Sequence, residues 1–165
     1  MKLVAASILV FSLVILFLFA LFPADISVNR VIQINRPAAE VLKKIDDLRE
    51  WKNWNLMLHN PSAGGMGNSQ TDMTDSDFLN MGGISVQIVK CERDTVITRW
   101  QRGNKFFTGN FNLAELNGQT MVEWTFRFHI RWYPWEKLAS MYYERQLGPL
   151  MEKSLLNLRN ELEKK

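Results

Sequence analysis

The sequence has very few of the residues that build disulfide frameworks, metal sites and most catalytic centres. Among its 165 residues there is one cysteine, Cys91, and there are two histidines. A single cysteine cannot form an internal disulfide, so a disulfide-stabilised fold is excluded, although the compartment is not fixed. Cys91 and the distant histidines also lack the closely spaced ligand pairs of zinc sites. We therefore expect no metal and no cofactor.

The chain also lacks a strong excess of charge. It has 20 basic and 17 acidic residues, which give a formal net charge of +3, and the basic residues are spread along the sequence. Nucleic-acid-binding domains usually gather Lys and Arg into a patch or stripe. We therefore expect no nucleic acid among the partners.

No group of residues predicts a catalytic or ion-binding motif. His59 falls in a predicted loop and His129 on the polar face of a predicted strand, and neither has the partner spacing of a triad or a general base. The acidic run at 72–77 is not an EF-hand loop, because the required Gly and Glu are missing. No catalytic residue is predicted.

What the sequence does contain is one long apolar run without charge. Leu3 to Phe22 reads LVAASILVFSLVILFLFALF, and polar residues follow at once. Twenty residues of α-helix rise about 30 Å, which matches the hydrocarbon thickness of a bilayer. We therefore predict a transmembrane helix over residues 3–22, a membrane anchor over residues 1–24 and a single-pass membrane protein.

A cleaved secretory signal is the competing interpretation of this run. Signal cores usually have about 7–15 apolar residues and precede a site with small residues at −1 and −3. Cleavage after Ala24 would place Phe22 at −3, so an uncleaved anchor fits better. Lys2 precedes the run, whereas Arg30, Arg36 and two lysines follow it. This distribution favours a cytoplasmic domain only weakly, and the side of the membrane stays open.

Residues 25–165 have the length of one domain and begin with a strand and two short helices. Alternating apolar residues predict a strand over Ile26 to Ile34. Pro37 then favours the first turn of a helix. A second short helix is predicted from Arg49 to Trp54, with its two tryptophans on one face.

The middle of the domain is a series of short strands separated by turn signals. Asn60 to Ser69 is rich in Gly, Pro, Ser and Asn and is predicted to be a surface loop. The Asn117-Gly118 pair predicts a hairpin. The strands are predicted over Ser69 to Asp75, Ile84 to Cys91, Thr95 to Arg102, Phe106 to Glu115 and Gln119 to Arg131.

The chain ends in a predicted helix that Tyr133-Pro134 opens. Pro149 should bend or interrupt this helix, because an interior proline removes a hydrogen bond and clashes with the preceding turn. After it, Met151, Leu155 and Leu158 recur at helical spacing and form an apolar stripe. A curved sheet cannot bury its apolar face alone, so we expect the last helix to lie across it.

Two segments carry a family resemblance: INRPAAEVLKKIDDLREWKNWN near the start of the domain and LGPLMEKSLLNLRNELEK at its end. With the order of elements, they resemble the START-like or SRPBCC superfamily, and most of all its polyketide cyclase/dehydrase and lipid transport branch. The resemblance covers residues 26–163 and implies an α+β helix-grip fold, a curved antiparallel sheet closed by a long C-terminal helix. The chain departs from the family pattern W-x-x-W-x-P-W at Leu56 and Met57.

The helix-grip fold implies a cavity between the sheet and the long helix. Such cavities are usually apolar and bind a hydrophobic ligand, so the expected partner is a hydrophobic small molecule or lipid. Aromatic residues at alternating strand positions also form filled cores, and that alternative stays open. The residues expected to line the cavity are Trp54, Trp100, Phe111, Trp124, Phe126, Phe128, Met151, Leu155 and Leu158.

A polar set alternates out of phase with these aromatic residues. We expect Arg99, Glu123 and Arg127 to lie on the outer face of the sheet and to form cross-strand ion pairs. A shift of one residue in the strand phase would move every side chain to the other face. Arg99 and Arg127 would then point into the cavity and could hold a carboxylate or phosphate.

We interpret the chain as a membrane-anchored domain that binds a hydrophobic ligand without covalent chemistry. One alternative is an enzyme resembling a polyketide cyclase or dehydratase. It would need Arg99, Glu123, Arg127 or Tyr142 inside the cavity, where a polar group could polarise a carbonyl. Another is a non-binding interaction or stress-response module, which would have a filled core and an exposed apolar patch elsewhere.

Overall fold

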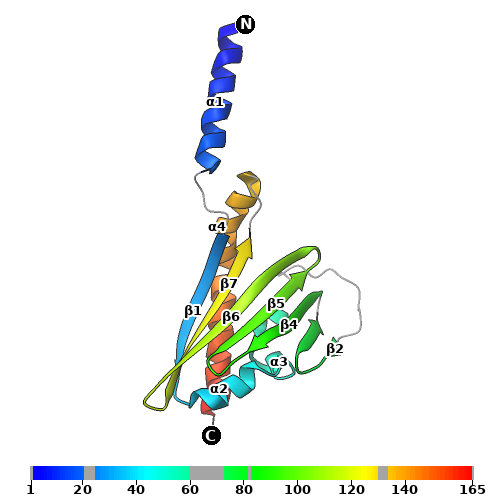
Figure 1. The fold of residues 1–165 in the computed structure, drawn as a ribbon, viewed down its shortest axis with the longest axis vertical. Helices are drawn as coiled ribbons and strands as arrows, with labels where there is room; N and C mark the ends of the chain where they lie inside the picture. The colour runs from blue at the N-terminus through cyan, green and yellow to red at the C-terminus, as the bar shows by residue number, and fades with distance from the viewer. Residues whose placement is uncertain (1, 21–24, 60–72, 82, 130–133, 165) are drawn as a thin grey trace.

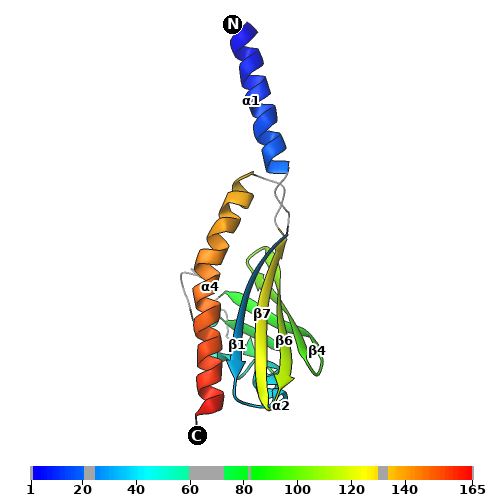
Figure 2. The ribbon, with the colours of Figure 1, turned by 90° about the vertical axis from the view of Figure 1, so that its left-hand side faces the viewer.

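The computed structural model of the chain describes residues 2–20, 25–59, 73–81, 83–129 and 134–164. It confirms the α+β helix-grip architecture, in which a curved sheet packs against a long C-terminal helix (Figures 1 and 2). The helices are α1 (Lys2–Ala20), α2 (Ala38–Ile45), α3 (Trp51–Trp54), the short 3-10 helix η1 (Leu56–Leu58) and α4 (Pro134–Glu163). The strands are β1 (Asp25–Ile34), β2 (Met73–Thr74), β3 (Phe78–Met81), β4 (Ile84–Cys91), β5 (Thr95–Arg102), β6 (Lys105–Leu116) and β7 (Gln119–His129).

The strands form one antiparallel sheet in the order β1-β7-β6-β5-β4-β3-β2. Each strand from β2 to β6 pairs with the next one in the chain, and β1 pairs with β7 along its whole length, from Asp25–His129 to Ile34–Thr120. The β6–β7 turn has φ of 54° at Asn117 and 74° at Gly118. These positive values are typical of the hairpin turn that an Asn-Gly pair predicts.

The register defines two ends of the sheet. At one end β1 begins at Asp25 opposite His129, and β5 turns into β6 after the Arg102–Lys105 pair. The chain enters this end from α1, so we call it the α1 end (Figure 1). The β6–β7 hairpin, α2 and the last turns of α4 lie at the opposite end (Figure 1).

Helix α4 covers one face of the sheet, which we call the inner face (Figure 2). It continues through Pro149 without a break, so of the two predicted outcomes, a bend or an interruption, it shows a bend (Figure 2). Where α4 crosses β1, Arg30 Nη2 donates to Glu144 Oε1 at 2.7 Å. A Cβ on Gly148 would collide with this guanidinium. A side chain at this position would make the Arg30 guanidinium shift, which the long arginine side chain allows.

The core lies between the inner face and the helices, and it confirms the predicted strand phase. Alternating residues of adjacent strands point to the same side of a sheet. From the strands, the buried residues include Val28, Ile34, Val86, Val96, Trp100, Phe111, Val122, Trp124 and Phe126. From the helices, they include Val41, Ile45, Trp51, Trp54, Met151, Leu155 and Leu158.

The sheet differs from the prediction at its β2 edge. Strand β3 was not predicted, because the three residues before it, Asp75, Ser76 and Asp77, have the composition of a turn. Strand β2 has only two residues, and 69–72 of its predicted range lie outside the described residues. The predicted loop at 60–69 lies outside them as well. Strand β7 is described as far as His129, and residues 130–131 of its predicted range lie outside the described residues.

The charge-free run at the start of the chain forms helix α1. Its exposed apolar residues include Val4, Ile8, Leu9, Val10, Phe11, Leu13, Val14 and Phe17. Across the part of the chain that the structure describes, no helix is both long enough and apolar enough to cross a membrane.

Candidate functional site

The aromatic residues predicted to line a cavity form one cluster on the inner face. Trp100, Phe111, Trp124 and Phe126 are fully buried. The register pairs Phe111 with Trp124 across β6 and β7, and their rings stack with centroids 4.9 Å apart. Phe126 meets Trp100 edge to face at 5.1 Å. Three neighbouring strands therefore supply a continuous aromatic surface.

The helices close this surface from the other side. Trp54 of α3 meets Trp124 in a T-shaped contact, with centroids 6.2 Å apart. Met151, Leu155 and Leu158 of α4 belong to the same buried core. Phe128 is half-buried and packs against this core near the α1 end. The structure thus brings all the predicted lining residues together, and their contact with a ligand stays a prediction.

Two aromatic members of the cluster were missed by the sequence analysis. Phe107 stacks on Trp100 with ring centroids 5.8 Å apart, and the ring centroids of Trp51 and Trp54 are 5.2 Å apart. Phe107 is in phase with Phe111 on β6, and Trp51 shares a helix face with Trp54. The periodicities that found Phe111 and Trp54 could therefore have found both.

A glycine on β6 lets polar and aromatic groups approach the sheet closely. Thr98 Oγ1 donates to the Gly109 carbonyl at 3.0 Å and accepts from Trp100 Nε1 at 2.9 Å. A Cβ at Gly109 would lie 2.6 Å from Thr98 Oγ1 and 2.8 Å from Trp100 Nε1. The sequence signal for this site is a glycine inside a strand, which often marks a close approach.

Two indole groups of the cluster are buried donors without a partner. Among the described residues, Trp54 Nε1 and Trp124 Nε1 have no hydrogen-bond acceptor. The other two indoles are paired, because Trp51 donates to the Ile45 carbonyl and Trp100 to Thr98. A buried unpaired donor costs about 1–3 kcal/mol. An acceptor oxygen brought to Trp54 and Trp124 would remove this cost.

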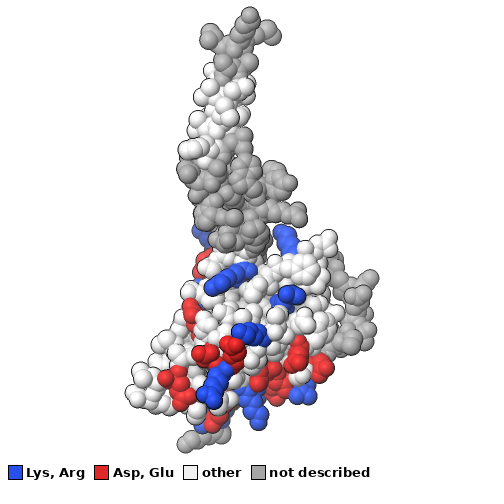
Figure 3. Space-filling model, in the orientation of Figure 1, with Lys and Arg blue, Asp and Glu red and all other residues white. Residues whose placement is uncertain are grey.

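The charged residues considered for catalysis lie on the outer face, which is the side seen in Figure 3. Arg99 and Arg127 are exposed and Glu123 is half-buried, while their strand neighbours Trp100, Trp124 and Phe126 are buried. The alternative strand phase is therefore wrong. The side chain of Tyr142 lies outside the described residues.

The predicted ion pairs of these residues are wrong. Arg99 and Arg127 both pair with Thr108 of β6, so the register places the two arginines in one row. Glu123 accepts instead from Asn29 Nδ2 at 3.4 Å and from Asn112 Nδ2 at 3.2 Å. The ion pairs found among the described residues do not include either arginine.

The residues with nucleophilic or metal-binding side chains are dispersed. His59 is exposed, with Nδ1 3.3 Å from the Asn55 carbonyl, and the side chain of His129 is not described. Partial burial raises the pKa of the Cys91 thiol, and the carboxylates of Asp46 and Asp77 raise it further. A raised pKa leaves less thiolate, the nucleophilic form. In the described ranges, no three His, Cys, Asp or Glu residues could hold a metal ion.

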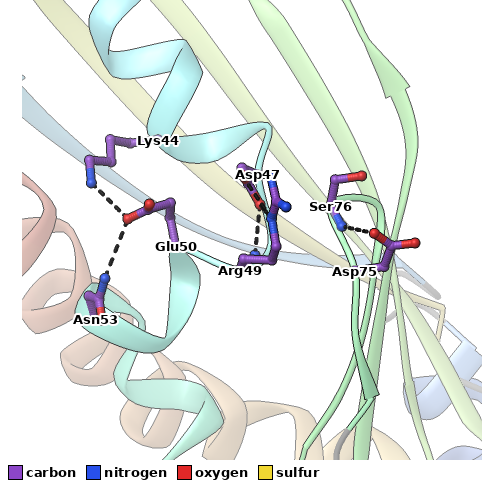
Figure 4. Close-up of polar contacts among 7 residues, drawn as sticks. All are labelled: Lys44, Asp47, Arg49, Glu50, Asn53, Asp75 and Ser76. Atoms are coloured by element: carbon purple, nitrogen blue, oxygen red, sulfur yellow. Dashed lines mark hydrogen bonds and ion pairs between the residues drawn. The ribbon is translucent and has the colours of Figure 1, made fainter.

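Polar contacts position the helix that carries Trp54 (Figure 4). Lys44 of α2 and Glu50 form an ion pair with an N–O distance of 2.7 Å, and Asn53 Nδ2 donates to the same carboxylate at 3.3 Å. The Arg49 guanidinium donates to both carboxylate oxygens of Asp47 and lowers the pKa of that carboxyl. These contacts connect α2 to the segment that leads into α3.

A hollow of about 490 Å³ lies beside α3 and the last turns of α4. It differs from the predicted cavity, because its lining is polar and includes none of the predicted aromatic residues. The lining residues are Asn53, Asn157, Asn160, Glu161, Glu163 and Lys164.

Solved structures with the same fold have little sequence identity to this chain. DynU16, from the dynemicin biosynthetic locus, has a TM-score of 0.57 and 16% identity over 83% of this chain, which spans only 47% of DynU16. A Nitrosospira multiformis protein has a TM-score of 0.58 and 12% identity, covering 82% of this chain and 95% of its own. A Thermobifida fusca protein has a TM-score of 0.59 and 13% identity, covering 81% and 90%. At these identities the likeness concerns the fold alone.

A family comparison is more specific. No curated protein sequence matches the chain significantly. The family described as polyketide cyclase / dehydrase and lipid transport matches residues 25–163, which include the whole sheet, α2, α3 and α4. The chain therefore belongs to the polyketide cyclase / dehydrase and lipid transport family.

Proposed function

We propose that the chain binds a hydrophobic small molecule or lipid between the sheet and α4, by non-covalent contacts alone. The observation that carries this proposal is the pair of buried, unpaired indole donors in the aromatic cluster, on Trp54 and Trp124. Binding pockets of this kind combine an apolar lining with a few polar groups that orient the ligand. A ligand with a carbonyl, ether or carboxylate oxygen would supply the missing acceptor.

Ligand entry requires the cluster to open. Its ring centroids are 4.9 to 6.4 Å apart, so the rings already contact one another. Trp54 is the member that moves most easily in this proposal, because it is carried by the four-residue helix α3. Trp100 and Trp124 are carried by central strands of the sheet. The ligand would then lie against those strands, with Trp54 covering it.

The enzyme alternative has less support. A cyclase or dehydratase needs a polar side chain beside the bound carbonyl, whereas Arg99, Glu123 and Arg127 lie on the outer face. Thr98 is a polar side chain buried within the cluster, and its hydroxyl both donates and accepts a hydrogen bond there. Binding therefore uses the groups present better than catalysis does.

A second candidate function is an interaction module, which exposed apolar residues favour. Val31, Leu116 and Met121 are exposed, on or beside the β6–β7 hairpin at the end opposite to α1. A protein partner could bind there without using the aromatic cluster. The two functions are separable, because substitutions at these residues would leave ligand binding unchanged.

We also propose that residues 3–22 attach the protein to a membrane. Ile8, Leu9, Val10 and Phe11 are consecutive and all exposed, so apolar side chains point in every direction around the helix axis. An amphipathic surface helix would have a polar face, whereas a helix that is apolar on all sides needs apolar surroundings. Attachment would keep the binding domain close to membrane-soluble ligands and raise their effective concentration.

Removing the unpaired donors tests the ligand site. We expect Trp54→Phe and Trp124→Phe each to weaken binding of a dansyl-labelled fatty acid by up to about tenfold, since each loses one hydrogen bond to the ligand. Binding is measured by energy transfer from tryptophan to dansyl, with the full chain in lipid nanodiscs and empty nanodiscs as background.

The matched control is Trp100→Phe, whose indole already has a protein partner. This variant trims the lining but removes no hydrogen bond to the ligand, so it should weaken binding less than Trp54→Phe or Trp124→Phe, and it should lose about 1 kcal/mol more stability than Trp124→Phe because it breaks a made hydrogen bond. Equal loss of affinity in all three variants, or none in any, would contradict the proposed site.

A further inference from the structure

We propose that the β5–β6 hairpin and the neighbouring outer face dock onto an anionic lipid surface. This inference rests on the proposed membrane attachment of α1 and adds the surface of the domain that meets the bilayer. We call that surface the basic hairpin patch. It consists of Arg99, Arg102, Lys105, Phe106 and Arg127.

The register places the patch at the α1 end of the sheet. Arg102 pairs with Lys105 beside the turn, and Phe106 pairs with Gln101 in the next row. The start of β1 lies at this same end. Because Asp25 follows the last residue of α1, Ala20, by five positions, these two residues lie within about 18 Å of each other. A bilayer that holds α1 is therefore close to the hairpin.

The patch combines free positive charge with an exposed aromatic ring. Phe106 is 62% exposed, and Arg99, Lys105 and Arg127 are exposed as well. None of these three basic residues takes part in an ion pair with a described residue. Exposed cations that no described acidic residue pairs with remain available for anionic groups outside the protein.

The acidic residues lie mostly elsewhere. Figure 3 shows blue side chains over the part of the outer face nearer α1, while red ones gather towards the opposite end. Asp25 is an acidic residue at the α1 end, and Glu144 of α4 is bound by Arg30 where the helix crosses the inner face. The basic hairpin patch is therefore positive, with Arg99 and Arg127 on the outer face and with Arg102 and Lys105 beside the turn, in phase with Trp100 and Phe107.

An anionic bilayer is the partner that this composition fits. Aromatic rings favour the headgroup region of a bilayer, and Lys and Arg are attracted to anionic lipid within about one Debye length, roughly 8 Å at physiological salt. A soluble polyanion would explain the charges, but it would explain neither the exposed Phe106 nor the position of the patch beside α1. Docking would also hold the sheet in a fixed orientation to the membrane.

The native cysteine offers an internal control for testing this geometry. Strand β4 runs from Ile84, which pairs with Arg102, to Cys91, which pairs with Val96 at the far end. An environment-sensitive NBD label on Cys91 therefore reports on the end away from α1. In the variant Cys91→Ser with Asn104→Cys, the same label reports on the hairpin turn.

The test uses the full chain with vesicles of phosphatidylcholine alone or with one-third phosphatidylglycerol. At position 104 we expect NBD emission to rise and shift to the blue only with the anionic vesicles, and to return to its vesicle-free intensity and wavelength at high salt. The emission of the label on Cys91 should change with neither kind of vesicle. Replacing Arg99, Lys105 and Arg127 by glutamine should weaken docking about fivefold for each charge removed.

A matched triple variant removes the same charge elsewhere: Lys43→Gln, Lys52→Gln and Lys153→Gln, all at exposed positions. Its affinity for the anionic vesicles should be within about twofold of that of the wild type. Equal responses to both kinds of vesicle, or equal effects of the two triple variants, would overturn the docking.

Vesicle flotation separates the two proposals. A chain that floats with both compositions while the NBD emission at position 104 does not change is attached but not docked. A chain that floats with neither contradicts attachment and docking together.

Discussion

Replacing Gly109 by alanine should destabilise the domain by about 4 kcal/mol. The new Cβ would lie 2.6 Å from Thr98 Oγ1, 2.8 Å from Trp100 Nε1 and 3.0 Å from Phe126 Cε1. Overpacking a core costs about 1–3 kcal/mol, and displacing Thr98 also breaks two buried hydrogen bonds. Thermal denaturation of the full chain should show a fall in Tm of about 10 °C.

Two further variants show whether the cause is the contact with Thr98. Thr108→Ala changes the neighbouring, outward-facing residue of the same strand and should shift stability by no more than about 0.5 kcal/mol. Thr98→Ala removes the nearest colliding atom, so its combination with Gly109→Ala should cost about 1 kcal/mol less than the sum of the two single variants. A Gly109→Ala protein as stable as the wild type would mean that Thr98, Trp100 and Phe126 are not packed as described.

The proposed attachment predicts that two lysines placed in α1 would release the chain from lipid vesicles. Val10 and Val14 lie near the middle of the run 3–22, and both are exposed. A lysine moved into the apolar part of a bilayer costs up to about 3 kcal/mol, so Val10→Lys with Val14→Lys should weaken the proposed attachment by up to about 6 kcal/mol. The measurement is the fraction of full chain that floats with phosphatidylcholine vesicles after a high-salt wash.

The control carries the same two lysines on the domain, at the exposed positions Ala114 and Gln119. This variant should float like the wild type, because its added charges stay in water. If the α1 variant floated as well as this control, the apolar run would not be what holds the protein to lipid.

Local patterns predicted most of the fold because they report local structure. The bounds of β4 and β5 agree with the predicted ranges, which rested on the alternation of Ile84, Val86 and Ile88 and on the turn at residues 92–94. The Asn117-Gly118 pair alone predicted the hairpin that it forms. The aromatic cluster followed from the same reasoning, since residues in phase on adjacent strands must share a face. The family resemblance supplied the closing helix as the partner of that face, and α4 has that place.

The failures are features that depend on register or on distant residues. Strand β3 was missed because its pairing with β4 outweighs the turn composition of Asp75 to Asp77. The ion pairs of Glu123 were wrong because strand phase gives the face of a side chain but not its neighbour across the sheet. Trp54 and Trp100 are equally aromatic in the sequence, yet only Trp54 has an unpaired indole, since the acceptor for Trp100 is Thr98.

Native mass spectrometry of the full chain, purified from cells in nanodiscs and released in the instrument, shows whether the aromatic cluster holds a hydrophobic ligand. We expect one tightly held hydrophobic molecule per chain, depleted in the double variant Trp54→Phe and Trp124→Phe. A bare chain mass for the wild type, together with no uptake of the dansyl-labelled fatty acid, would contradict it.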